Sequence, residues 1–217
     1  MEPIYSPPQT PFLEILHQDE HMLAINKQSG LLSVPGRLPE KKDSIQLRAQ
    51  SLHPTALTVH RLDMETSGVI VMALGEEMHR ALSRLFQDRE TQKTYLARVG
   101  GTINQQEGTI DLPLRCDWPN RPRQIVDHDL GKPAQTHWRV LNCGPDETLV
   151  ELTPVTGRSH QLRVHMLSLG HPILGDSLYA PDELKKKVPH LQLHAHRLSF
   201  IHPATGKRIA FTAPCPF

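Results

Sequence analysis

Apolar and polar residues alternate in several short runs along this chain of 217 residues. Such runs, bounded by Gly, Pro, Asn, Asp or Ser, are typical of β-strands joined by turns. The pattern predicts strands at residues 21–26, 69–74, 94–99, 149–155, 191–200 and 208–212. The last two are separated by PATG at 203–206, so they are expected to form a hairpin.

Helical spacing is clearest between Gly75 and Glu90. Apolar side chains recur there at positions 78, 82, 85 and 86, and two glutamates complement the dipole at the helix start. A second helix is predicted from about Ser159 to Leu169, closed by a glycine at position 170, and a short one at residues 44–52.

Predicted strands outnumber predicted helices, so the sequence favours an α+β fold with a mostly antiparallel mixed sheet and flanking helices. Residues 1–11 hold four prolines and are expected to form an extended arm. The remainder, residues 12–217, suits one catalytic domain or two closely joined lobes.

Charge changes this picture locally rather than globally. The chain carries 24 Lys and Arg against 23 Asp and Glu, yet residues 152–175 contain no acidic residue. Residues 115–123 add three arginines against Asp117 alone, and basic faces of this kind can follow a phosphate backbone. Three widely spaced cysteines, the lack of a signal-peptide pattern and the lack of a long apolar run predict a cytoplasmic protein without membrane spans.

The stretch HRLDMETSG at residues 60–68 is the strongest candidate for chemistry. Asp63 follows Arg61 in a charged loop between apolar runs, where catalytic groups are often held. A carboxylate beside a cation stays ionised, and it can act as a nucleophile, a base or a stabiliser of positive charge. The alternative is an ordinary surface ion pair, which contributes little.

Five ordered blocks of the sequence resemble the RluA family of RNA pseudouridine synthases. HRLDMETSG resembles the segment around that family's catalytic aspartate, and KTYLARVGG at 93–101 the segment with its active-site tyrosine. The other three blocks are GRSHQLRVHMLSLGHPILGD at 157–176, NKQSGLLSVPG at 26–36 and LQLHAHRLSF at 191–200. Gln28 departs from the family, which usually has proline there, and is expected to loosen the following turn.

The resemblance implies the pseudouridine synthase catalytic fold with a central active-site cleft, and an isomerase that needs no cofactor and no metal. Such enzymes cleave the glycosidic bond of a uridine in RNA and rejoin the uracil through C5. The early start of the core and CDWPNRPRQ at 116–124 look most like the RluA subgroup, which lacks an S4 domain. That subgroup modifies 23S ribosomal RNA and the anticodon stem-loop of tRNA. A monomer is expected.

The resemblance also implies roles for individual residues. Asp63 is the expected essential group, by attack on C1′, by addition to the ring or through a glycal. Arg163 is expected to pair with Asp63, and Tyr95 to stack on the flipped uracil. Arg61 is expected to fill the gap that the extruded base leaves. The expected substrate-binding residues are completed by His60, Leu162, His160 and Gln161.

Two other classes of function compete with this interpretation. A non-catalytic RNA-binding protein explains the basic segments but gives the Asp63 loop no task. A metal-free hydrolase that uses Asp63 is the second. Ser159 and His160 with a distant aspartate also suggest a hydrolase, but a GxSxG elbow is missing. The fourteen histidines lack the spacing of a zinc site, so metal catalysis is disfavoured.

Overall fold

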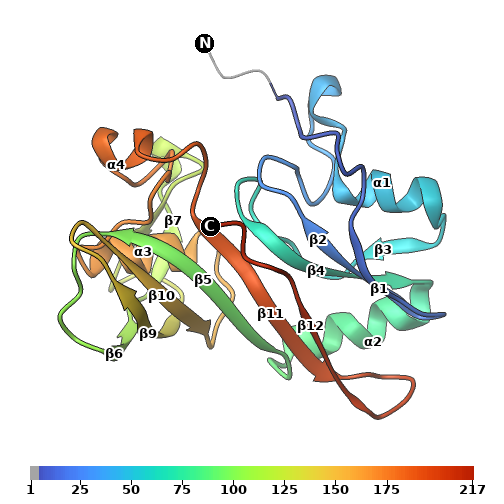
Figure 1. The fold of residues 1–217 in the computed structure, drawn as a ribbon. Coiled ribbons are helices and arrows are strands. Elements are labelled where there is room, and N and C mark those ends of the chain that lie inside the picture. The colour runs from blue at the N-terminus through green and yellow to red at the C-terminus, as the bar shows by residue number, and fades with distance from the viewer. Residues whose placement is uncertain (1–4) are drawn as a thin grey trace. The chain divides into compact units, whose positions relative to one another are not determined.

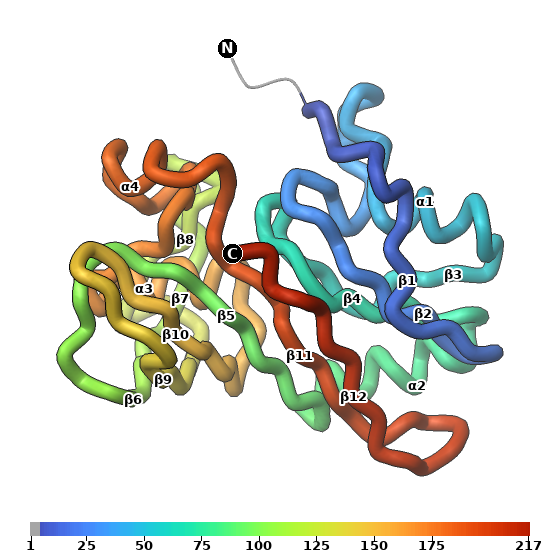
Figure 2. Tube along the Cα trace, viewed as in Figure 1, coloured from blue at the N-terminus to red at the C-terminus, as the bar shows by residue number. Residues whose placement is uncertain are grey.

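The computed structural model describes residues 5–217, which form two compact units. Unit 1 takes in the chain up to Lys93 together with Ala195–Pro216, and unit 2 takes in Thr94–His194 and Phe217. In Figures 1 and 2, unit 1 therefore combines the blue-to-green start of the chain with its red end, and unit 2 spans the green-to-orange middle. Residues 1–4 of the predicted arm lie outside the described residues.

The sheet of unit 1 is centred on β4 (Ser67–Leu74), whose residues are buried except for the last. An uninterrupted Val, Ile, Met and Ala run suits a strand that is covered on both faces. β4 pairs antiparallel with β2 (Met22–Lys27) and with β3 (Ala56–Thr58), and β1 (Ile15–Gln18) pairs with β2.

Two helices and a C-terminal pair of strands complete unit 1. α1 (Ile45–Leu52) begins after Ser44, whose hydroxyl accepts the Leu47 N–H at 3.3 Å. α2 (Glu76–Gln87) buries its apolar stripe in one cluster with residues of β2 and β4. β11 (Leu193–Ile201) pairs antiparallel with β12 (Arg208–Thr212), and Phe200 and Phe211 join the same cluster. A short 3-10 helix lies at Pro39–Lys41.

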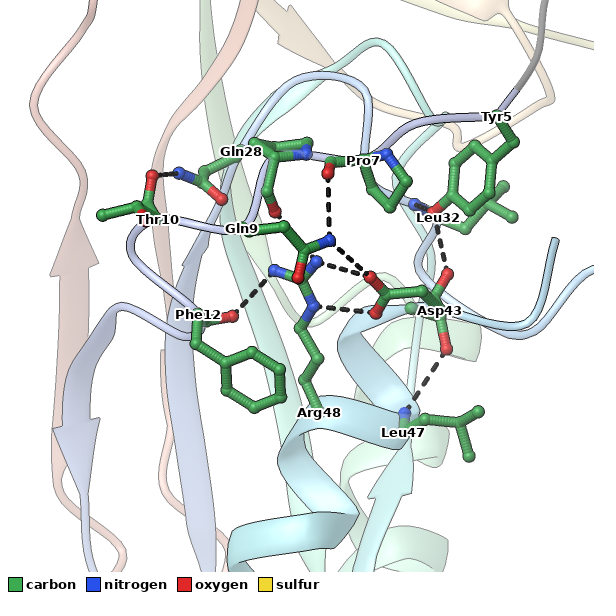
Figure 3. A network of polar contacts seen from close by, with 12 residues as sticks. Tyr5, Pro7, Gln9, Thr10, Phe12, Gln28, Leu32, Asp43, Leu47 and Arg48 are labelled. Atoms are coloured by element: carbon green, nitrogen blue, oxygen red, sulfur yellow. Dashed lines mark hydrogen bonds and ion pairs between the residues drawn. The ribbon is translucent and has the colours of Figure 1, made fainter. Parts of the chain in front are cut away.

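The described part of the N-terminal arm is fixed to unit 1 by Arg48 of α1 (Figure 3). The Arg48 side chain is buried and makes a bidentate pair with Asp43, with distances of 2.8 and 2.6 Å. It also donates to the carbonyl oxygens of Pro8 and Phe12, at 2.8 and 2.9 Å. Carbonyl groups outside regular structure need hydrogen-bond partners. The guanidinium of Arg48 supplies partners for two of them and so holds this segment in place.

Gln28 adds a second tie between the arm and unit 1. Its side-chain amide donates to the carbonyl oxygen of Thr10 at 2.8 Å (Figure 3). A proline at this position has no such donor. The residue that departs from the family pattern therefore fastens its turn to the arm.

Unit 2 contains four antiparallel strands that pair in the order β5-β10-β9-β6. Its strands are β5 (Gln92–Gly100), β6 (Glu107–Asp111), β9 (Gln135–Cys143) and β10 (Glu147–Pro154). α3 (Gln161–Ser168) contributes Leu162 and Met166 to the apolar cluster of this sheet. A separate hairpin joins β7 (Leu114–Cys116) to β8 (Gln124–Val126), with a 3-10 turn at Trp118–Asn120, and α4 covers Asp182–Lys186.

Candidate active site

The segment from His60 to Thr66, here called the Asp63 loop, connects β3 to β4 of unit 1. Arg61 is exposed, Leu62 is buried and Asp63 is half-buried. Burial of Leu62 anchors the middle of the loop, so the two charged residues beside it are presented from a fixed backbone.

Residues 28–33, which follow β2, hold the Asp63 loop through its backbone. The Ser33 hydroxyl donates to the Leu62 carbonyl at 2.7 Å and accepts the Leu62 N–H at 3.0 Å. The Gly30 N–H donates to the Met64 carbonyl at 2.9 Å. The residues on both sides of Asp63 therefore have hydrogen-bonded backbone groups, which fixes the backbone that carries its carboxylate.

Lys27 is a buried residue beside the Asp63 loop that the sequence reasoning missed. It is fully buried, and its ammonium donates to three carbonyl oxygens, those of Gln28 at 2.9 Å, Leu31 at 2.6 Å and Met64 at 2.8 Å. Burial lowers the Lys27 pKa to about 7, whereas the carboxylates of Asp63 and Glu65 raise it. The sequence signal that could have identified Lys27 is its position directly after the predicted strand at residues 21–26. A lysine is rarely buried unless it has a partner, so one at the end of a buried strand indicates a specific contact.

His60, at the start of the loop, is held as a neutral ring. Its Nε2 accepts the Val71 N–H of β4 at 3.0 Å, so the ring proton is on Nδ1. The imidazole stacks on Phe86 with 4.3 Å between centroids. Burial, and secondarily the charge of Lys93, lower the His60 pKa to about 3. The predicted contact of His60 with substrate stays a prediction. The contacts of its ring with Val71 and Phe86 give it a structural role within unit 1.

Gly68, the second residue of β4, stands where only glycine fits. Its φ is +108°, and a Cβ there would lie 2.3 Å from the Ala195 carbonyl oxygen of β11. Because both the backbone conformation and the space exclude a side chain, this glycine sets how β4 leaves the loop.

The second group of predicted site residues lies on α3 of unit 2. His160 precedes the helix in a left-handed conformation with φ of 53°. The Gln161 amide makes four hydrogen bonds within the protein, to Gln135 at 2.9 Å, Thr136 at 3.0 Å, Thr156 at 2.7 Å and Arg158 at 3.0 Å. These occupy its two donors and two acceptor positions, so its side chain fixes the start of α3. The predicted substrate contact of Gln161 stays a prediction.

Arg163 forms a buried bidentate ion pair with Asp176. Its Nε and Nη2 donate to the two carboxylate oxygens at 2.8 and 2.7 Å. Asp176 also accepts the backbone N–H groups of Leu178 and Tyr179, at 2.9 and 3.1 Å. Sequence reasoning missed Asp176, although it is the first acidic residue after the basic stretch. The expected pair of Arg163 with Asp63 joins residues of different units and stays a prediction.

Tyr179 connects this ion pair to His160. The Tyr179 hydroxyl lies 2.7 Å from His160 Nδ1 and accepts the Gln124 N–H at 2.8 Å. The guanidinium carbon of Arg163 lies 5.2 Å from the centroid of the Tyr179 ring, within cation–π range. Burial raises the pKa of the Tyr179 phenol, which therefore stays a neutral hydrogen-bonding group.

Tyr95 and Leu162 belong to the same apolar cluster of unit 2. Tyr95 of β5 faces Leu152 of β10 across the sheet and is half-buried, whereas Leu162 is buried. A half-buried phenol bordered by a leucine offers the flat apolar surface that a base needs for stacking. The structure thus brings these two predicted residues together, and their contact with uracil stays a prediction.

The described residues offer neither a metal site nor a membrane span. No group of three or more His, Cys, Asp or Glu side chains within residues 5–217 is placed to hold a metal ion. Nor does this part of the chain contain a helix that is long and apolar enough to cross a membrane.

The fold and the Asp63 loop identify the class of protein. The family model of RNA pseudouridylate synthase matches residues 21–168, which include β2, the Asp63 loop, Tyr95 and α3. The chain belongs to this family, and it is an isomerase that acts on RNA.

Curated and solved relatives agree with this assignment. The chain is 56% identical over 214 residues to the dual-specificity RNA pseudouridine synthase RluA of Escherichia coli K12, covering 98% of both chains. It is 50% identical to the protein of the same name from Pasteurella multocida, again over 98% of both. Human RNA pseudouridylate synthase domain containing 1 superposes with a TM-score of 0.81 at 30% identity, covering 98% of this chain and 87% of that one.

Proposed function

We propose that the protein isomerises uridine to pseudouridine in two kinds of RNA, a hairpin of 23S ribosomal RNA and the anticodon stem-loop of tRNA. The observation that carries this proposal is the 56% identity, over 98% of both chains, to a relative named as dual-specificity. The pre-organised Asp63 loop supports it, because the loop supplies the carboxylate that the reaction requires.

In the proposed reaction, the N1–C1′ bond of uridine breaks and a C5–C1′ bond forms. The C5 proton is released to water and N1 gains a proton, so substrate and product are isomers. Asp63 acts on the electron-poor sugar or ring, as carboxylates do in glycoside chemistry. Arg163 keeps Asp63 ionised and oriented. Tyr95 and Leu162 hold the extruded base, with His60, His160 and Gln161 shaping the surrounding surface.

Release of tritium from C5 tests the reaction directly. Anticodon stem-loop RNA and a 23S-derived hairpin, each with [5-³H]uridine, are incubated with the protein, and tritium in water is counted. Wild-type protein is expected to release it from both RNAs. Asp63→Asn is expected to abolish release while RNA binding, measured by filter retention, stays within about threefold. An active Asp63→Asn variant would refute the assigned chemistry.

Arg61 is proposed to occupy the RNA stack in place of the extruded base. Arg61 is exposed, and its guanidinium is planar and stackable. Arg61→Ala is expected to slow single-turnover isomerisation about 10- to 100-fold, because extrusion costs a few kcal/mol. Arg80→Ala is the matched control, since Arg80 is also exposed and makes only a 4.0 Å pair with Glu76. Equal rates for the two variants would remove the role of Arg61.

We further propose a cytoplasmic monomer. Within residues 5–217, Cys116, Cys143 and Cys215 are not joined in disulfides, which suits a reducing compartment. Sedimentation equilibrium is expected to return the mass of one chain, about 24.5 kDa.

A further inference from the structure

The tip of the β7–β8 hairpin in unit 2 presents an exposed tryptophan with an arginine stacked on it. Trp118 is 63% exposed, and the guanidinium carbon of Arg121 lies 4.4 Å from the centroid of its ring. Trp138, the second tryptophan of the chain, is 4% exposed. Because the guanidinium covers part of the Trp118 ring, the indole is held in position while much of its surface stays open to a ligand.

The tip that carries Trp118 is ordered by its own hydrogen bonds. The Asp117 N–H donates to the Arg123 carbonyl at 2.9 Å, and the Arg123 N–H donates to the Asn120 carbonyl at 3.1 Å. Asn120 binds Asp117 twice, through its backbone N–H at 3.0 Å and its side-chain amide at 2.9 Å. A ligand that stacks on Trp118 therefore meets a pre-organised loop and loses little entropy in ordering it.

The base of the tip is fastened to Tyr179, the residue that contacts Arg163. Gln124 of β8 donates its N–H to the Tyr179 hydroxyl at 2.8 Å, and the guanidinium carbon of Arg123 lies 5.4 Å from the Tyr179 ring centroid. The hairpin that carries Trp118 and the predicted catalytic arginine thus share one contact residue, Tyr179, within unit 2.

The charge of the tip selects the kind of ligand. Arg115 is paired with Asp127, and Asp117 is the sole acidic residue between positions 115 and 123. Arg121 and Arg123 both lie over aromatic rings. An aromatic face beside a guanidinium suits a nucleobase with its phosphate, and every base has a π-face.

We propose that Trp118 and Arg121 form a stacking platform for an unpaired base of the substrate RNA, distinct from the uridine that reacts. The base must be unpaired, because bases inside an A-form helix stack on one another and do not offer their faces. This proposal depends on the proposed function in one respect, which is that the RNA ligand is taken to be a stem-loop substrate.

Tryptophan fluorescence tests the platform without relying on activity. Anticodon stem-loop RNA is titrated into wild-type protein, Trp118→Phe and Trp118→Leu, with a loop-free duplex of the same stem as control. We expect the stem-loop to quench the wild type strongly and the duplex to quench it little. Trp118→Phe should bind the stem-loop with little quenching, since buried Trp138 is its remaining indole. Equal quenching in wild type and Trp118→Phe would overturn the proposal.

Kinetics provide the second measurement. Trp118→Leu is expected to raise KM for the stem-loop about 5- to 100-fold with kcat nearly unchanged, the loss of one stacked base. Trp118→Phe should stay within about threefold of wild type in KM. An unchanged KM in Trp118→Leu would refute the platform, and would leave the indole to a protein partner or to solvent.

Failure of the platform and failure of the proposed function give different results. If wild-type protein releases no tritium from the stem-loop but its Trp118 fluorescence is quenched, the assigned substrate is wrong, whereas the binding of an unpaired RNA base at Trp118 stands. Normal release with identical kinetics in wild type and Trp118→Leu refutes the platform alone.

Discussion

At the scale of single residues, the chain uses buried charge to hold its candidate catalytic groups. Lys27 and Arg163 are each buried, and each uses several donors within the protein. Burying an ion costs several kcal/mol unless hydrogen bonds replace its water. Asp176 and the carbonyl oxygens around Lys27 provide that replacement. Both cations therefore hold neighbouring groups in place. Lys27 binds the carbonyl oxygen of Met64, the residue next to Asp63, and Arg163 binds the carboxylate of Asp176.

The lowered pKa of Lys27 predicts a specific dependence of stability on pH. Between about 7 and the usual lysine value of 10.5, the folded protein releases this proton while the unfolded chain keeps it. The unfolded state then binds more protons, so the free energy of unfolding gains from Lys27 as pH rises, by at most about 1.4 kcal/mol per pH unit. Below pH 7, both states are protonated and the burial cost is complete.

Urea unfolding of wild type and Lys27→Met at pH 6.5, 8 and 9.5 measures this contribution. The difference in the free energy of unfolding, wild type minus variant, is expected to increase from pH 6.5 to 9.5. Subtracting the variant removes other titrating groups such as Lys93. A difference that is flat or decreasing with pH contradicts the assignment of a depressed pKa to Lys27.

At the scale of elements, the strands and helices that carry strong patterns were predictable from the sequence. The predicted hairpin strand 208–212 coincides with β12, and the helix at Gly75–Glu90 corresponds to α2, shortened because Gly75 and Asp88 cap it. The α+β class with a mostly antiparallel sheet is confirmed. Weakly patterned strands were not found. β6 and β9 alternate buried residues with exposed polar ones but hold few apolar side chains, so packing rather than composition determines them.

The candidate site was predictable in its residues but not in their partners. HRLDMETSG and GRSHQLRVH resemble family motifs, whereas Ser33 and Asp176 contribute through hydrogen bonds to residues 29 and 13 positions away. Short-range patterns carry no information on such pairs. Gly68 is intermediate, because a glycine after a loop suggests a turn but not a close approach to β11.

Gly68→Ala is expected to be destabilising by several kcal/mol. The new Cβ meets the Ala195 carbonyl oxygen at 2.3 Å, so a strand must shift in addition to the cost of a positive φ. Gly206→Ala is the control, because Gly206 has φ of +68° and a Cβ added there would meet no atom within 4 Å. That variant should lose about 1 kcal/mol. Thermal unfolding of both separates the two effects, and equal losses would show that the close approach costs nothing.

At the scale of the whole molecule, the predicted catalytic set is divided between the two units. Asp63, Arg61 and His60 belong to unit 1, whereas Tyr95, Arg163 and the other α3 residues belong to unit 2. The division into one arm and one catalytic domain stays a prediction. Within unit 1, the arm reaches the Asp63 loop indirectly, because Gln28 binds Thr10 and the neighbouring Gly30 binds Met64.

Loss of Arg48 is expected to release the arm from unit 1. Arg48→Met removes the bonds to Pro8, Phe12 and Asp43 but keeps most of the buried aliphatic volume. Cleavage by chymotrypsin after Phe12 should accelerate at least tenfold, because release of the arm exposes this backbone. Arg80→Met, on the exposed face of α2, should leave this cleavage rate unchanged. Protection in Arg48→Met equal to that of wild type would show that Tyr5 and Gln28 suffice to hold the arm.

The discontinuity of unit 1 has a consequence for the nascent chain. Phe200, Phe211 and Ala213 complete an apolar cluster whose other members include Met22, Val71 and Leu82. Synthesis proceeds from the N-terminus, so that cluster stays incomplete until the end of the chain emerges, whereas unit 2 is made in one continuous stretch apart from its final residue. Unit 1, which carries Asp63, is therefore the first unit to emerge during synthesis and the last to complete its apolar core. Ribosomes that stall before residue 195 would therefore leave an exposed, chaperone-dependent surface in the half with the proposed catalytic carboxylate.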